Sequence, residues 1–334
     1  MSEVISKRSE LLFCYDVTDA NPNGDPMDEN KPRIDEETGI NIVTDVRLKR
    51  TVRDYLYDYR GYNGTDGKDI LIREIQEESG LQDAKMRAED FLLVEGKKIK
   101  KNELKNFVDK EKPKISELQM MTEIIDRNIK AQCIDLRLFG ATLPIEFTSK
   151  EKSSITYTGP VQFKMGRSLH PVELKHIKGT GAFASGPGSQ QKTFREEYIL
   201  PYSFIAFHGI INETAAAHTN LTENDVQELL TAIWQGTQNL ISRSKFGQMP
   251  RLLLKVTYKE KGFFIGDLDK KIQITSLENP LKIRSLKDFT LDITDLLSVL
   301  EKFANKIEAV EYLKDADLKL KPGLLANFKS LNLT

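Results

Sequence analysis

The sequence predicts an α+β fold, because strand-like and helix-like patterns alternate along one chain of 334 residues. Residues 10–17 form a mostly apolar run that is typical of a buried strand. Residues 194–212 hold the longest strand candidate, with an expected interruption at Pro201. Apolar residues at helical spacing predict helices that begin after Thr44 and after Thr222.

Prolines and glycines exclude regular structure over residues 19–39, which we therefore expect to form turns before the first helix. That helix should end by Gly61. Residues 62–130 differ in character, and we interpret them as a mostly helical insertion. Within it, a helix is expected from Ser116 to about Lys130.

In the second half of the chain, residues 154–164 resemble a strand pair around Gly159, and the glycine-rich residues 179–190 resemble a flexible loop. Residues 251–258 should form a buried strand and residues 292–305 a further helix. The helix after Thr222 is expected to bury Val226, Leu229, Leu230, Ile233, Trp234, Leu240 and Ile241. The order strand, helix, strands, helix, strand fits a ferredoxin-like or RNA-recognition-motif (RRM) core.

The charges of the chain nearly balance, with a formal net charge of −1, so overall charge favours no class of partner. A surface for a polyanion must therefore come from local clustering of cations. Cys14 and Cys133 lie far apart in apolar runs, which favours a reducing compartment over a disulfide framework. No apolar run approaches the length of a membrane span and no signal segment is evident, so we expect a cytoplasmic protein without a membrane partner.

Cations gather at the start of the helix that follows Thr44. Arg47, Lys49, Arg50 and Arg53 fall in its first turns, where the helix dipole already favours an anion. Cations at this end destabilise a helix unless an anion is present. A solvated helix face is the alternative, but the pattern favours a site for a nucleic-acid backbone.

Oxygen-bearing side chains alternate from Asp19 to Asp25, as they do at the start of a calcium-binding loop. The pattern then fails, because Asn30 stands where the loop needs a bidentate glutamate and a strand precedes it. Two interpretations remain: a plain turn, or a loop shaped to meet a ligand through residues such as Asn21 and Asn23.

A second basic segment holds Lys164, Met165, Gly166 and Arg167. This combination suits single-stranded nucleic acid, because cations hold phosphates while a flexible apolar side chain wedges between bases. The alternative is that Met165 fills a gap in the core.

Residues 179–184 match the G-x-G-x-x-A pattern of dinucleotide folds, but Gly186 and Pro187 prevent the helix that would hold the pyrophosphate. A mobile loop that folds on a partner fits this segment better. The sequence holds no phosphate loop, no nucleophile elbow and no metal-ligand spacing among its four histidines, and His208 is expected in the core. We therefore predict no catalytic residue, no metal and no cofactor.

Together these stretches resemble the backbone subunit of type I CRISPR Cascade complexes, within the RAMP superfamily and nearest to the type I-B branch. The specific match joins DANPNGDP at residues 19–26 to TDVRLKR at residues 44–50. Further matches are PRID at 32–35, TG at 38–39, GPVQF at 159–163, GRS at 166–168 and ILPYS at 199–203. The pieces cover most of residues 11–255 in the expected order.

The resemblance implies a hand-shaped protein with an RRM-like palm. Residues 1–61 and 131–334 would form this palm, with a thumb hairpin inserted around residues 165–195 and with residues 62–130 as helical fingers. The thumb would reach a neighbouring copy, and the lysines of the fingers would face target DNA.

The resemblance also implies a protein without catalytic activity, whose copies polymerise along one crRNA and present this guide to target DNA in antiviral defence. The expected partners are other Cascade subunits (the large, small and repeat-handling subunits) and a helicase-nuclease recruited by the complex. The residues expected to bind RNA are Asn21, Asn23, Thr44, Arg47, Lys49, Arg50, Arg53, Lys164, Met165, Gly166, Arg167, Lys192 and Arg195.

Two other functions stay open on the sequence. Type III relatives in the same superfamily cut target RNA with an acidic loop residue, a role that Asp25, Asp35 or Asp45 would fill in a metal-dependent ribonuclease. A small-molecule enzyme with a ferredoxin-like fold is the other alternative.

Overall fold

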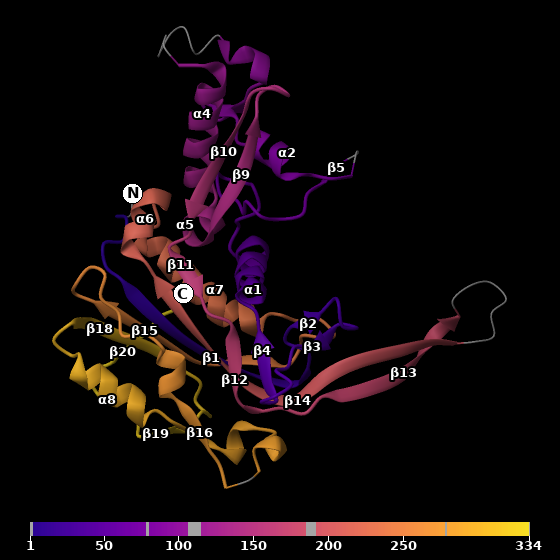
Figure 1. Cartoon of the computed structure of the whole chain (residues 1–334), viewed down its shortest axis with the longest axis vertical. Helices are drawn as coiled ribbons and strands as arrows, with labels where there is room; N and C mark the ends of the chain where they lie inside the picture. Colours follow the sequence, from indigo (N-terminus) through magenta and orange to yellow (C-terminus); the bar gives the residue numbers. More distant parts are fainter. Residues whose placement is uncertain (1–2, 78–79, 106–114, 185–191, 278, 334) are drawn as a thin grey trace. The chain divides into compact units, whose positions relative to one another are not determined.

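The computed structural model describes residues 3–77, 80–105, 115–184, 192–277 and 279–333 (Figure 1). The chain divides into two compact units. Unit 1 comprises Met1–Ser6, Arg53–Val161 and Asn212–Leu229, and unit 2 comprises Lys7–Val52, Gln162–Ile211 and Leu230–Thr334. Among the described residues, no helix combines the length and the apolar character that crossing a bilayer requires.

Unit 2 is built on a central mixed sheet, which confirms the α+β class. Its middle strand, β1 (Ser9–Ala20), pairs antiparallel with β14 (Lys192–Ile211) on one side and β15 (Gln248–Tyr258) on the other. The full strand order is β20-β18-β15-β1-β14-β12-β4. The outer strands are β18 (Ile307–Lys314), β20 (Lys329–Ser330), β12 (Gly166–Pro171) and β4 (Ile40–Val43), and β11 (Val161–Phe163) and β13 (Lys175–Ala184) also pair with β14.

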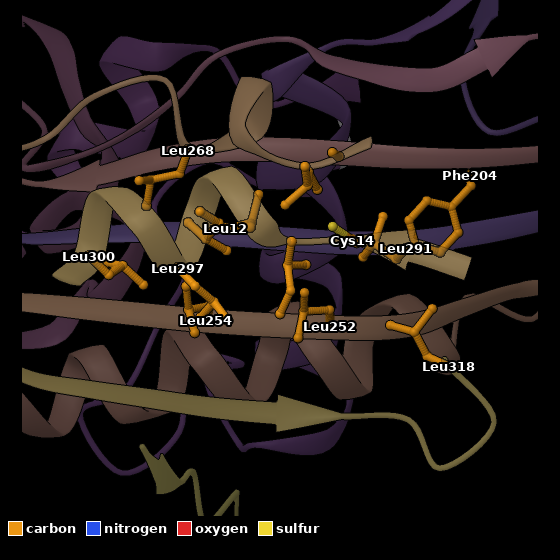
Figure 2. Close-up of a cluster of buried hydrophobic side chains, with 14 of the residues drawn as sticks. Leu12, Cys14, Phe204, Leu252, Leu254, Leu268, Leu291, Leu297, Leu300 and Leu318 are labelled. Carbon is orange, nitrogen blue, oxygen red and sulfur yellow. The ribbon is translucent and has the colours of Figure 1, made fainter. Parts of the chain in front are cut away.

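One face of this sheet carries the main core of unit 2. Because side chains alternate along a strand, Leu12 and Cys14 of β1 and Leu252 and Leu254 of β15 point to the same side. They pack with α8 (Thr294–Lys302), whose Leu297 lies among them in Figure 2. The remaining short elements of unit 2 are β2 (Gly24–Asp25), β3 (Lys31–Pro32), η2 (Leu268–Lys271), β16 (Gln273–Thr275), η3 (Pro280–Lys282), η4 (Leu286–Asp288), β17 (Thr290–Asp292) and β19 (Leu320–Lys321).

Strand β14 runs unbroken through Pro201, so the predicted interruption is wrong. The proline is tolerated because the register of β1 and β14 skips it: Thr18 pairs with Tyr202 and Ala20 with Leu200. The register is the same on both sides of this gap, and Asp19, which stands opposite Pro201, has a φ of 48°. Because Pro201 is not a paired position of this ladder, its missing N–H costs no ladder hydrogen bond to β1.

The predicted loop at residues 179–190 is also wrong in its first half. Strand β13 continues to Ala184 and pairs antiparallel with the first half of β14, with Lys175 opposite Ile199 and Gly179 opposite Arg195. These two strand segments form a two-stranded ribbon in unit 2 (Figure 1). Residues 185–191 lie outside the described part of the chain.

The two helices predicted from N-cap residues are present as α1 (Asp45–Tyr59) and α7 (Glu223–Gln238). Thr222 and Asp225 cap α7 reciprocally, since each side chain accepts the other residue's backbone N–H. The helix ends before Leu240 and Ile241, so their assignment to its buried side is wrong, and Ile241 is exposed. A short helix, α6 (Glu213–Thr219), precedes α7.

Unit 1 has its own core, formed by α2 (Ala84–Glu89), α4 (Glu117–Gln132), α5 (Ile134–Phe139), β9 (Gly140–Glu146) and β10 (Lys152–Thr158). Ser116 caps α4 as predicted. Residues 62–130 thus share a core with residues 131–161. This unit also contains η1 (Lys101–Glu103), the hairpin of β5 (Gln76–Glu77) and β6 (Gly80–Leu81), and the hairpin of β7 (Leu93–Val94) and β8 (Lys97–Lys98).

Candidate nucleic-acid interface

The loop between β1 and α1 is held in shape by its asparagines. Asn21 is only 2% exposed, and its Nδ2 donates to the carbonyl of Asn30 at 2.7 Å. Oδ1 of Asn23 accepts from the backbone N of Thr44 at 2.8 Å and from its Oγ1 at 2.9 Å. Gly24 is required, because a Cβ there would lie 2.7 Å from the backbone carbonyl oxygen of Asn30. The predicted contact residues Asn21, Asn23 and Thr44 therefore fix the loop against the start of α1.

The cations of α1 in unit 2 differ in what they touch. Thr44 caps the helix, since its Oγ1 accepts the N–H of Arg47 at 3.2 Å. The guanidinium of Arg47 is half-buried and donates to Oγ1 of Thr51 at 3.0 Å. Lys49 forms an ion pair with Asp45 at 3.0 Å, which offsets part of the unfavourable interaction with the helix dipole. Arg50 is exposed.

Arg53, on the same helix, lies in unit 1 and has a structural environment. Its Nε donates to Oδ2 of Asp135 at 2.9 Å, and its guanidinium lies over the ring of Phe139 at 5.2 Å. Asp135 is fully buried and also accepts the backbone N–H groups of Leu71 and Ile72. A role for Arg53 in binding RNA stays a prediction, and it competes with this ion pair.

The segment between β11 and β12 exposes the side chains predicted to meet a single strand. Met165 is 52% exposed, so the interpretation of Met165 as a core residue is wrong. Arg167 is exposed and lies 3.8 Å from a carboxylate oxygen of Asp35. Gly166 lets the strand approach the sheet, because a Cβ there would lie 2.3 Å from the ring of Phe207.

Two contacts bring this segment beside the start of α1. Nζ of Lys49 donates to Oε1 of Gln162 at 3.2 Å. In the sheet, Gly166 pairs with Val43, the residue immediately before Thr44. We call the cations and the methionine that these two neighbouring segments carry the cationic strip; its members are Lys49, Arg50, Lys164, Met165 and Arg167.

A cavity of about 590 Å³ opens beside the strip. Met165, Leu174 and Ile42 supply apolar walls, and Arg33 and Thr44 supply polar groups. Nε of Arg33 is buried without a hydrogen-bond partner in the described structure, although its Nη1 is paired with Asp25 at 2.6 Å. Asp25, Asp28 and Glu36 also line this cavity, so its polar lining carries charges of both signs.

Lys192 and Arg195 lie on the ribbon and not on the strip. In the register of β13 and β14, Lys192 is opposite Ala184 and Arg195 is opposite Gly179. The structure describes the backbone of these two residues only.

Sequence reasoning missed Lys245, which lies far from the loop in sequence and touches it in the fold. Its Nζ donates to the carbonyl of Asn21 at 2.6 Å. Burial, together with the nearby charge of Arg47, lowers the pKa of Lys245 to about 8. No periodicity or motif pointed to this residue, because only the tertiary fold creates the contact.

The predicted acids and histidines are used in structural contacts. Asp45 pairs with Lys49, Asp25 with Arg33, and Asp35 accepts two backbone N–H groups of its own loop. His208 is buried as predicted and bonds to Glu10 at 2.7 Å. Within the described ranges, three or more histidine, cysteine or acidic side chains nowhere form a group suited to a metal ion.

Comparisons with known proteins agree with these features. The family model for "CRISPR-associated protein Cas7" matches residues 7–294. A CRISPR-associated protein Cas7 from Haloferax volcanii is 33% identical over 331 residues, covering 95% of this chain and 89% of that protein.

Two solved structures share the fold. A chain of a "CRISPR RNA-guided surveillance complex, pre-nicking" has a TM-score of 0.56 at 13% identity, covering 97% of this chain and 96% of that one. A chain of a "CRISPR RNA-guided surveillance complex" has a TM-score of 0.51 at 11% identity, covering 97% and 94%. The resemblance is thereby confirmed at the level of the family, and this chain belongs to the family of CRISPR-associated Cas7 proteins.

Proposed function

We propose that this chain is a non-catalytic subunit of a CRISPR surveillance complex whose copies coat a crRNA. The observation that carries the proposal is the cationic strip, which joins the two segments that the sequence marked independently. The hydrogen bond between Lys49 and Gln162 and the pairing of Gly166 with Val43 bring these segments together. The family membership of the chain supports the same function.

The strip suits the sugar-phosphate backbone of a single strand. Lys49, Arg50 and Arg167 supply charge for phosphates, while the exposed Met165 offers an apolar wedge between bases. Such contacts carry no base specificity and leave base edges free. Pairing between guide and target then reads the sequence, as it does in other RNA-guided complexes.

The ribbon of β13 and β14 is our candidate for the thumb that reaches a neighbouring copy. Ile177 on the ribbon and Leu174 just before it are exposed apolar side chains, which favour docking against another protein surface. The sheet of unit 2 would be the RRM-like palm. Residues 62–130, which fall in unit 1, would be the fingers, and their lysines would face target DNA.

The wider assignment follows the resemblance to Cascade backbone subunits, nearest to the type I-B branch. The partners would be other subunits of the complex, target DNA and a recruited helicase-nuclease, in antiviral defence within the cytoplasm. Both structural neighbours are chains of RNA-guided surveillance complexes, which supports crRNA and other subunits as partners.

Co-expression of the full chain with a repeat-spacer transcript tests the proposal. We expect short processed RNA to co-purify, with a high ratio of absorbance at 260 to 280 nm and a particle of several subunits. A nucleic-acid-free monomer would contradict it. Incubating the complex with matching target RNA and magnesium tests the ribonuclease alternative, because regularly spaced fragments would favour that activity.

A further inference from the structure

Two carboxylates hold Lys164, a member of the cationic strip. Its Nζ donates to Oδ1 of Asp267 and lies 3.7 Å from Oδ1 of Asp269. The lysine side chain is 44% exposed and that of Asp267 is 47% exposed. Although partial burial lowers the pKa of Lys164, the contacts with Asp267 and Asp269 raise it more, so the net shift is upward.

The segment that carries these two acids is anchored to the sheet. The backbone N–H groups of Ile265 and Gly266 each donate to the carboxylate of Glu10 at 2.8 Å. Glu10 is fully buried in β1 and also bonds to His208 and Tyr258. These contacts of Glu10 fix the segment just before its acids begin.

The two acids themselves are held in place at the lysine. Asp267 has a φ of 52°, in the left-handed region that residues other than glycine, asparagine and aspartate rarely adopt. Oδ1 of Asp269 is buried and lacks a hydrogen-bond partner within the described structure. It faces Nδ1 of His208 at 4.0 Å in addition to Lys164. Both carboxylates are therefore pre-placed at the lysine.

We propose that Asp267 and Asp269 occupy on Lys164 the place of a guide phosphate, so that RNA binds this part of the strip by displacing them. The carboxylate oxygens lie at the ammonium group of Lys164, where the oxygens of a phosphodiester would bind. Lys164 would donate charge-assisted hydrogen bonds to either group. This inference rests on the proposed function, because it takes the strip as the RNA surface. It adds that the protein shields one cation from other anions until the RNA arrives.

RNA must break an exposed ion pair of Lys164 before it can bind there. The free energy of such a pair corresponds to a two- to fivefold change, so the wild type should bind RNA about two- to fivefold more weakly than it would without the pair. Asp267→Asn keeps the shape of the side chain, removes its charge and tolerates the left-handed backbone. We expect this variant of the full chain to bind a repeat-spacer RNA about two- to fivefold more tightly than the wild type. Asp267→Gly also accepts the backbone conformation and should show the same gain.

Glu308→Gln is the matched control, because it removes the same charge from an exposed ion pair, with Lys7 of unit 2. It should leave RNA affinity nearly unchanged. In a Lys164→Ala background, Asp267→Asn should give no gain, although it still frees Lys270, the other cation paired with Asp267 at 3.2 Å. An equal gain in Glu308→Gln, or a gain that persists without Lys164, or no gain in either Asp267 variant would overturn the inference. In each case RNA binding itself would remain, whereas a wild-type chain that binds no RNA would overturn the proposed function instead.

Discussion

Unit 1 buries Arg53, Arg87 and Arg137 against carboxylates, whereas unit 2 leaves most cations of the strip accessible. In unit 1, Arg87 pairs with Asp69 at 2.5 Å and Arg137 pairs with Asp225 at 2.7 Å, with little of either arginine exposed. In unit 2, Arg167 is more than half exposed. The difference shows that the partner supplied by the fold, and not the residue type, decides whether a cation is buried in an ion pair or stays accessible.

The sharpest form of this contrast lies on one helix. Arg53→Ala should destabilise the protein by about 3–5 kcal/mol, because Asp135 would remain as an uncompensated buried charge. Arg50→Ala, three residues away and exposed, should change stability by less than about 0.5 kcal/mol. Urea unfolding of both variants measures the difference. Equal losses for the two would break the comparison between the units.

Lys245 adds a third case to this contrast, because it is a half-buried cation of unit 2 that donates to a carbonyl instead of a carboxylate. Its pKa of about 8 in the fold lies below the ordinary lysine value of 10.5, so the unfolded chain binds more protons between these values and stability rises with pH there. We expect a gain of about 2 kcal/mol between about pH 7.5 and 9.5 from this group. Unfolding curves should show that gain in the wild type and not in Lys245→Met; parallel pH profiles would contradict it.

Gly166→Ala tests whether the strip has a rigid backing. The added Cβ would lie 2.3 Å from the ring of Phe207, and such overpacking should cost about 1–3 kcal/mol. Gly179→Ala on the ribbon is the control, because nothing lies within 4 Å of its added Cβ. Thermal melts should separate the two variants, and a neutral Gly166→Ala would show that the sheet yields at this point.

Met165→Ala should have the smallest effect on the fold. An exposed side chain loses little when truncated, so stability should change by less than about 0.5 kcal/mol. A buried methionine would lose about 2–5 kcal/mol instead. A loss of that size in urea unfolding would contradict the assignment of Met165 to the exposed strip and would show that it packs in the core.

The helices could be predicted because their signals are local. Thr44, Ser116 and Thr222 each precede a helix whose first turn they cap. Pro201 misled the prediction, since only the pairing of β14 with β1 shows that the proline falls where the ladder has no residue pair. The end of α7 was predicted too late, because the apolar residues Leu240 and Ile241 follow the last helical turn and extend the apolar pattern.

The candidate site was predictable in its segments and not in its pairings. The sequence placed Lys49 and Arg53 in one cluster, but the buried Asp135 that holds Arg53 lies more than eighty residues away. Asp267, which holds Lys164, and Lys245, which holds the loop of Asn21, are still more distant in sequence from the residues they contact. Such contacts depend on tertiary packing, which no local pattern encodes.

The salt dependence of RNA binding by the full chain tests the central claim most directly. Replacing Lys49 and Arg50 by alanine should reduce the slope of log affinity against log salt by about 1.4, since each lost contact with a single strand removes about 0.7. The control removes Lys261 and Lys319, two exposed lysines of unit 2, and should keep the wild-type slope. An unchanged slope in the Lys49 and Arg50 variant, with RNA still bound, would contradict the assignment of the cationic strip to the RNA backbone.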